Sequence, residues 1–114
     1  MTSNQSHKAV VFGSISIDKI VNKHGIFIDV LGGSAAYALL ANKKNTCELV
    51  GVVGDDFQSK HFNLLSEHSK TTNSLTQMNG NTFCWGGKYQ DDFSSRETLY
   101  VDPGVSDSYL PDLS

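Results

Sequence analysis

Two short apolar runs place the strongest constraint on the fold of this chain. Residues 8–12 (KAVVF) are closed by a Gly-Ser pair, and residues 48–53 (ELVGVV) are closed by a glycine and two aspartates. Apolar side chains at consecutive positions need cover on both faces of a strand, which is typical of a parallel sheet between two layers. A helical segment lies between the runs, so they predict an α/β fold with right-handed βαβ units.

The residues between the two runs predict a β-hairpin followed by a helix. Residues 15–21 and 26–31 are rich in β-branched side chains and flank a turn that contains Gly25. Residues 35–44 have high helix propensity and follow Ser34, which can cap the first turn. This helix is apolar nearly all round, so we expect it to be buried.

Residues 57–68 predict a second helix, because five side chains recur on one face at helical spacing: Phe57, His61, Leu64, Leu65 and His68. Asp55 or Asp56 is expected to cap its first turn. Histidines at this spacing are more often structural than metal ligands, and neither cysteine lies at ligand spacing to them. The sequence therefore predicts no metal site.

The last third of the chain predicts antiparallel strands added to the parallel sheet. Residues 75–78 and 81–89 flank Asn79-Gly80, a strong signal for a hairpin, and residues 98–101 suit a further short strand. Residues 102–114 contain both prolines of the chain and are expected to be a loop-like tail.

Length and charge limit the classes of function. The 114 residues suffice for a single domain, 1–114, with residues 1–7 as a disordered polar tail. The net charge is −3 and no stripe of Lys or Arg occurs, so we expect no nucleic-acid or membrane partner. The start of the chain lacks the apolar core of a secretion signal, so we expect a cytoplasmic protein. Cys47 and Cys84 are interpreted as buried thiols, with a single disulfide as the alternative.

Three features mark positions where chemistry can occur. Asp18 follows the first strand, where open α/β sheets bind ligands, and its carboxylate can accept hydrogen bonds from two sugar hydroxyls. A turn-capping role suits its position equally. Gly32-Gly33 permits close backbone approach before a helix N-terminus, although a plain turn is the commoner reason for such a pair. The third feature is an aromatic face on residues 83–89, which can stack on a sugar or purine but is more often core.

Several familiar signatures are missing from the sequence. No G-x-G-x-x-G follows the first strand, and no G-x-x-x-x-G-K-[ST] or G-x-S-x-G occurs. The sequence therefore predicts neither a dinucleotide site, nor a P-loop, nor a hydrolase nucleophile elbow.

Taken in order, several segments resemble the amino-terminal half of the ribokinase-like (PfkB) carbohydrate and nucleoside kinases. They are VVFGSISID at 10–18, GGSAAYALLA at 32–41, VGVVGDDF at 50–57 and NTFCWGGKY at 81–89. A fifth segment, SSRETLYVDPGV at 94–105, resembles a subgroup of uncharacterised sugar kinases. The resemblance implies a partial Rossmann-like βαβ parallel sheet with antiparallel lid strands.

The same resemblance implies a substrate-binding role for five residues. Asp18 matches the family's aspartate that binds substrate hydroxyls, and Gly32 and Gly33 match the glycines that line the sugar site. Tyr37 stands where many members have an Asn contact, and Arg96 matches a subgroup position near the site. The expected small-molecule partner is a sugar or a nucleoside. Two departures, at Cys84 and Ser94, leave the substrate unspecified.

The resemblance also implies what this chain lacks. In the family, the glycine-rich anion hole, the catalytic Asp and the ATP site belong to the carboxy-terminal half, and no G-A-G-D occurs here. The expectation is therefore the substrate-binding part of a kinase, truncated before its catalytic half and inactive alone, with ATP and Mg²⁺ as cofactors only of the complete enzyme. We expect it to pair as a homodimer or with the missing half. The alternative is a stand-alone non-catalytic domain for ligand binding or self-association.

Overall fold

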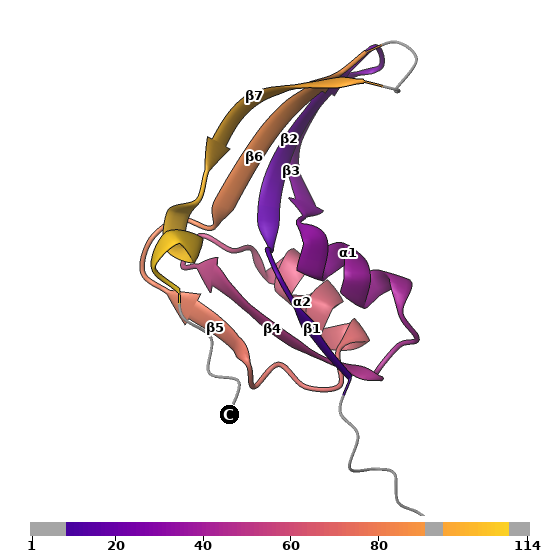
Figure 1. The fold of residues 1–114 in the computed structure, drawn as a ribbon, viewed down its shortest axis with the longest axis vertical. Helices are drawn as coiled ribbons and strands as arrows, with labels where there is room; N and C mark the ends of the chain where they lie inside the picture. The colour runs from indigo at the N-terminus through magenta and orange to yellow at the C-terminus, as the bar shows by residue number, and fades with distance from the viewer. Residues whose placement is uncertain (1–8, 91–94, 110–114) are drawn as a thin grey trace, which may run out of the picture.

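The computed structural model describes residues 9–90 and 95–109, which form two β-sheets and a pair of helices (Figure 1). The elements in chain order are β1 (Ala9–Phe12), β2 (Ser16–Asn22), β3 (Gly25–Gly32), α1 (Ser34–Ala41), β4 (Cys47–Gly54), α2 (Ser59–His68), β5 (Leu75–Met78), β6 (Phe83–Tyr89), β7 (Arg96–Asp102) and the 3₁₀ helix η2 (Gly104–Ser108). The predicted α/β class is confirmed.

The first sheet has the strand order β1-β4-β5 and is entirely parallel. Val11 is the register partner of Leu49, and Gly51 is that of Leu75. One face of this sheet packs on α1 and α2, and together they bury the core, whose fully buried members include Ile15, Leu39, Leu49 and Leu65. The predicted βαβ unit of β1, α1 and β4 is present. β5 was expected to be an antiparallel addition, but it runs parallel to β4 and completes a second unit through α2.

The opposite face of the first sheet is only partly covered. Alternation along the strands places Val10, Phe12, Val50 and Val52 on it. Val50 and Val52 are buried, and η2 packs against β4, but Val10 is 48% and Phe12 55% exposed. The expectation that the first apolar run is covered on both faces is wrong for the described residues, because both helices lie on one side.

The second sheet has the order β3-β2-β6-β7 and projects away from the helices as a curved ribbon (Figure 1). The predicted hairpin of β2 and β3 is confirmed by their antiparallel pairing, and β7 pairs antiparallel with β6. β6, however, runs parallel to β2. The predicted antiparallel lid is thus a mixed sheet with one parallel pair at its centre.

The predicted hairpin around Asn79-Gly80 is wrong, because the strands on either side of it belong to different sheets. β5 pairs with β4, whereas β6 pairs with β2. The connection between them is held against the end of β4, where Asp55 N–H donates to the Gly80 carbonyl at 3.0 Å and Gly54 N–H donates to Thr82 Oγ1 at 2.9 Å. Gly80 has φ +126°, a backbone conformation that favours glycine. It lies in the connection that passes from one sheet to the other, and not in a tight hairpin turn.

Neither predicted helix cap is observed. Gly33, not Ser34, precedes α1, and α1 ends at Ala41 before the lysines at 43 and 44. Gln58 precedes α2 and makes no side-chain cap hydrogen bond. Asp56 instead accepts hydrogen bonds from Thr82, from its N–H at 2.9 Å and its Oγ1 at 2.7 Å. This carboxylate links the end of β4 to the start of β6.

The remaining expectations concern the ends of the chain and the cysteines. The segment expected to be loop-like begins with the last residue of β7 and contains η2, in which Val105 is buried. The expected tail at 1–7 lies outside the described residues. Cys47 is a buried free thiol and Cys84 a half-buried one. Within the described ranges, no helix has the length and apolar character needed to cross a membrane.

Candidate functional site

An open cavity of about 410 Å³ lies between the start of α1 and the face of the second sheet that carries Asp18 and Trp85. Its volume is within the range of small-molecule sites. The lining comprises one carboxylate, one guanidinium, three serines, four aromatic rings, an isoleucine and a glycine: Asp18, Arg96, Ser14, Ser16, Ser34, Tyr37, Phe83, Trp85, Tyr89, Ile20 and Gly33. Four of the five residues assigned to substrate binding from the sequence line this cavity, and Gly32 lies beside Asp18.

Asp18 is the only carboxylate among the lining residues. It lies on β2, is 7% exposed, and accepts a hydrogen bond from Ser16 Oγ at 2.7 Å. Burial raises the pKa of the Asp18 carboxyl above its ordinary value, while the Ser16 hydrogen bond acts in the opposite direction. Ser16 occupies one acceptor position, so the other lone pairs remain for hydroxyl donors from a ligand.

Gly32 makes room for this carboxylate. It is the register partner of Ser16 on the neighbouring strand. A Cβ atom at Gly32 would lie 2.1 Å from Asp18 Oδ2 and 3.0 Å from Ser16 Oγ. The absence of a side chain at Gly32 is therefore what allows Asp18 to take its buried position.

Gly33, in contrast, makes room for the backbone of Ser14. Its φ is +95°, and a Cβ atom there would lie 2.4 Å from the Ser14 carbonyl oxygen. This close approach lets Ser14 accept two hydrogen bonds from the first turn of α1, from Ala35 N–H to its carbonyl at 2.9 Å and from Ser34 N–H to its Oγ at 3.1 Å. The helix N–H groups expected to face a ligand are thus already engaged at these two positions.

The aromatic side chains of β6 form one wall of the cavity. Phe83, Trp85 and Tyr89 recur at period two and share a face, as the sequence predicted. The preference for a core position was wrong, because these three side chains are half-buried and line the cavity. Trp85 is the register partner of Asp18, and its ring meets that of Tyr89 edge-on at 6.5 Å between centroids. Arg96 Cζ stands 5.1 Å from the centroid of the Trp85 ring.

Tyr37 borders the cavity from α1 and is 57% exposed. Partial burial raises the pKa of Tyr37, and the charges of Asp18 and Tyr89 add to this. Its phenol therefore stays neutral near neutral pH and is available as a hydrogen-bond donor.

Cys84 alternates with the cavity-facing residues of β6 and donates from Sγ to the Thr82 carbonyl at 3.2 Å. Burial raises the pKa of Cys84, as do the charges of Asp56, Asp102 and Asp18. A neutral thiol at this position is not an activated nucleophile. Ser94, the other departure from the subgroup, lies outside the described residues.

The serines of the cavity were missed by the sequence reasoning. Ser14 and Ser16 precede Asp18 at period two, which is the spacing of side chains on one strand face. That alternation was the available signal. Ser34 joins them in space through its hydrogen bonds with Ser14, at 3.3 Å between the two Oγ atoms.

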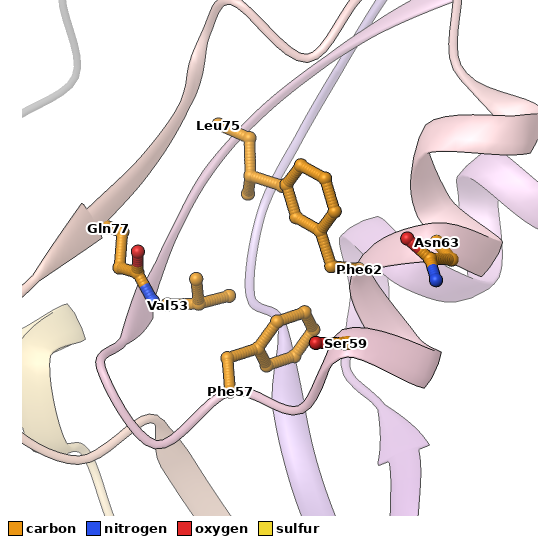
Figure 2. A pocket seen from close by; sticks show the side chains of 7 residues that line it. All are labelled: Val53, Phe57, Ser59, Phe62, Asn63, Leu75 and Gln77. Carbon is orange, nitrogen blue, oxygen red and sulfur yellow. The ribbon is translucent and has the colours of Figure 1, made fainter.

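A second cavity, of about 280 Å³, lies between α2 and β5 (Figure 2). Figure 2 shows its lining, which is apolar or uncharged: Val53, Phe57, Ser59, Phe62, Asn63, Leu75 and Gln77. It contains no ionisable side chain and so offers no acid, base or metal ligand. No group of three His, Cys, Asp or Glu residues that could hold a metal ion occurs anywhere in residues 9–90 and 95–109.

Comparison with solved structures identifies the fold. A ribokinase from Cryptococcus neoformans in complex with ADP superposes with a TM-score of 0.73 and 22% identity, over 100% of this chain and 38% of its own. A nucleoside kinase from Burkholderia thailandensis in complex with inosine gives 0.60 and 19%, over 84% and 37%. A nucleoside kinase from Methanocaldococcus jannaschii gives 0.58 and 20%, over 90% and 38%. The chain therefore has the ribokinase-like fold and spans less than two fifths of each of these structures.

No protein-family model matches the sequence, and no curated protein sequence matches it.

Proposed function

We propose that this chain is the substrate-binding part of an ATP-dependent kinase of the ribokinase-like (PfkB) family, acting on a sugar or a nucleoside. The observation that carries the proposal is the cavity in which a buried carboxylate, Asp18, adjoins an aromatic wall. Carboxylates that accept hydrogen bonds from hydroxyls and aromatic rings that contact apolar ring faces are a common arrangement for binding sugars and nucleosides. The fold likeness to ribokinase and nucleoside kinases supports the same assignment.

In this proposal each residue of the cavity binds or orients the substrate. Asp18 accepts hydrogen bonds from two adjacent hydroxyls, and Gly32 leaves the space that this carboxylate needs. Tyr37 and Arg96 border the substrate from α1 and β7, and Gly33 fixes the start of α1 beside it.

The described residues do not fit ATP or Mg²⁺. The α1 N–H groups of Ser34 and Ala35 already donate to Ser14, and no described cluster of acidic residues could hold a cation. In the complete enzyme, the phosphate cradle, the metal ligands and the catalytic base must therefore come from other residues. We propose that the isolated chain transfers no phosphate.

The partially covered face of the first sheet is a candidate surface for contact with another protein segment. Val10 and Phe12 are about half exposed there, and the solved structures are more than twice as long as this chain. We propose that the rest of a kinase or a second copy of this chain covers this face. The proposed location is the cytoplasm, in accord with two free thiols.

A stand-alone binding domain without catalysis is the second candidate. It is favoured by the core between the helices and the first sheet, which the described residues bury by themselves. Ile15, Leu39 and Leu49 are each at most 1% exposed. Such a domain would either bind a ligand at the same site without a catalytic part, or associate with a second copy of itself.

The test of the proposed function is calorimetric titration of the chain with ribose and with inosine. Replacing Asp18 by Asn is expected to weaken binding by about 1–3 kcal/mol, the range for hydrogen bonds to a charged group. Asp29→Asn is the matched control, because Asp29 is exposed and has φ 56°, a conformation that Asn tolerates. Affinity that is unchanged in Asp18→Asn would show that Asp18 does not hold the ligand.

A further inference from the structure

Arg96 places a cation inside the candidate cavity. It is the first residue of β7 and the register partner of Tyr89, so both side chains lie on the same face of the second sheet. Its guanidinium stands 5.1 Å from the centroid of the Trp85 ring and lines the cavity. A guanidinium remains charged at any physiological pH.

Among residues 9–90 and 95–109, no carboxylate forms an ion pair with Arg96. The one ion pair within these residues joins Lys44 to Glu67, and neither of them lines the cavity. The Trp85 ring attracts the guanidinium through its face but leaves the N–H donors at the guanidinium edge unused. Arg96 therefore offers a planar set of donors that matches a carboxylate or phosphate.

The cavity thus carries opposite charges at separate places. Asp18 is the register partner of Trp85, and Arg96 lies over the ring of that tryptophan, yet Asp18 and Arg96 form no ion pair. A ligand that spans the two needs hydroxyl donors at one end and an anion at the other. A neutral sugar would bring no anion to Arg96, and a cationic ligand would be repelled by it.

The position of Arg96 also bears on the choice between a sugar and a nucleoside. The guanidinium covers one face of the Trp85 ring, so a base can stack on that face only after Arg96 has moved. An anionic sugar needs no such movement. Resting on the proposed function, we infer that the substrate is a sugar or polyol that carries a carboxylate or phosphate, and that Arg96 binds this anion.

The experiment compares two matched pairs of compounds by calorimetric titration. D-gluconate and D-glucitol have the same carbon chain and differ in a carboxylate, while ribose 5-phosphate and ribose differ in a phosphate. The wild-type chain is expected to bind the anionic member of at least one pair about tenfold more tightly, as a charge-assisted hydrogen bond allows. The pair that shows the preference identifies the anion.

Three variants assign the preference to Arg96. Arg96→Gln is expected to remove it, and Arg96→Lys to retain part of it because the charge is kept. Lys88→Gln, which removes a cation from the opposite face of β6, is expected to retain it in full. Urea unfolding checks that each variant is folded, and the fluorescence of Trp85, the only tryptophan in the chain, reports a ligand that binds beside it.

Two results would overturn the inference. Equal affinity for both members of each pair would show that no anion site exists, and no binding by any of the four compounds would overturn the inference together with the proposed function. A preference that survives Arg96→Gln would assign it to another residue. The proposed function fails separately, when Asp18→Asn leaves the affinities for the neutral members unchanged. If that variant weakens neutral binding while the anion brings no gain, the inference fails and the proposed function stands.

Discussion

Gly32 and Gly33 are adjacent in sequence, but a side chain at each would disturb a different part of the molecule. A methyl group at Gly32 meets the Asp18 carboxylate, whereas one at Gly33 meets the backbone of Ser14. We predict that Gly32→Ala weakens ligand binding with a small effect on stability, because a side chain can move aside. Gly33→Ala is expected to lower the free energy of unfolding by about 1–3 kcal/mol, because φ is positive and the backbone cannot yield.

Urea unfolding and calorimetric titration of both variants test this difference. Gly25→Ala is the control for the effect of φ alone, since Gly25 has φ +137° and a Cβ atom there would meet nothing within 4 Å. Equal losses of stability in Gly32→Ala and Gly33→Ala would contradict the division of roles.

Asp18 is predicted to reduce stability at neutral pH. Its folded-state pKa is raised above the ordinary value of 3.8, so the folded chain binds the proton more tightly than the unfolded chain does. Stability therefore falls as pH rises from 3.8 through the raised pKa. We expect Asp18→Asn to unfold at a higher temperature than the wild type near neutral pH, and this difference to disappear in acid.

Ligand affinity should have the opposite pH dependence. Hydroxyl donors need the ionised carboxylate, so affinity is expected to fall as pH falls through the raised pKa of Asp18. Thermal unfolding and titration across this range check both trends, with Asp29→Asn as the comparison. A lower unfolding temperature for Asp18→Asn near neutral pH would mean that the Ser16 hydrogen bond outweighs burial.

At the scale of elements, β6 depends on a glycine to keep its tryptophan in the cavity. A Cβ atom at Gly87 would lie 2.1 Å from the Trp85 indole. We predict that Gly87→Ala displaces the ring and separates it from Arg96, which shifts the fluorescence emission of Trp85. Gly86→Ala is the comparison, because its Cβ atom would meet the Tyr100 ring instead. An unchanged emission spectrum in Gly87→Ala would show that the indole has room to adjust.

The existence of the elements was predictable from the sequence, whereas part of their pairing was not. Glycine-bounded apolar runs and helical periodicity identify strands and helices through local physics. The partner of a strand depends on residues far along the chain, and β5 and β6 join different sheets although Asn79-Gly80 lies between them. The signal for a tight turn was real, but hydrogen bonds to the end of β4 decided the path.

The candidate site was predictable to a similar degree. Asp18 and the two glycines were identified by their position and by the family resemblance, and the cavity gathers Tyr37 and Arg96 with them. The aromatic face of β6 was correctly located but assigned to the core. Periodicity shows which residues share a face and cannot show what covers that face.

At the scale of the whole molecule, the chain exposes apolar surface on both sheets. Val10 and Phe12 are exposed on the first sheet, and the strands at the two edges of the second expose a larger set: Ile26, Phe27, Ile28, Leu99, Tyr100 and Val101. Exposed apolar edges favour pairing with another chain. We predict that the isolated chain is not a stable monomer and forms a homodimer at micromolar concentration.

Sedimentation of the wild type and two variants tests this prediction and locates the interface. Phe12→Ser is expected to restore the monomer if the first sheet associates, and Ile28→Lys if the second sheet does. A wild-type chain that sediments as one soluble, cooperatively folded monomer would show that the two helices suffice to cover the fold.

The one-sided placement of the helices limits the ways in which a larger sheet could gain a helix on its uncovered face. The strand order advances in a single direction, from β1 through β4 to β5, with both crossover helices on one face. Right-handed connections bring a helix to the other face only when the order advances the opposite way, outward from β1. β1 would then lie where the strand order reverses, the place at which open α/β sheets bind ligands beyond the strand ends. Ser14 follows the end of β1 and already lines the cavity, so the crevice of the larger sheet would open onto the same site.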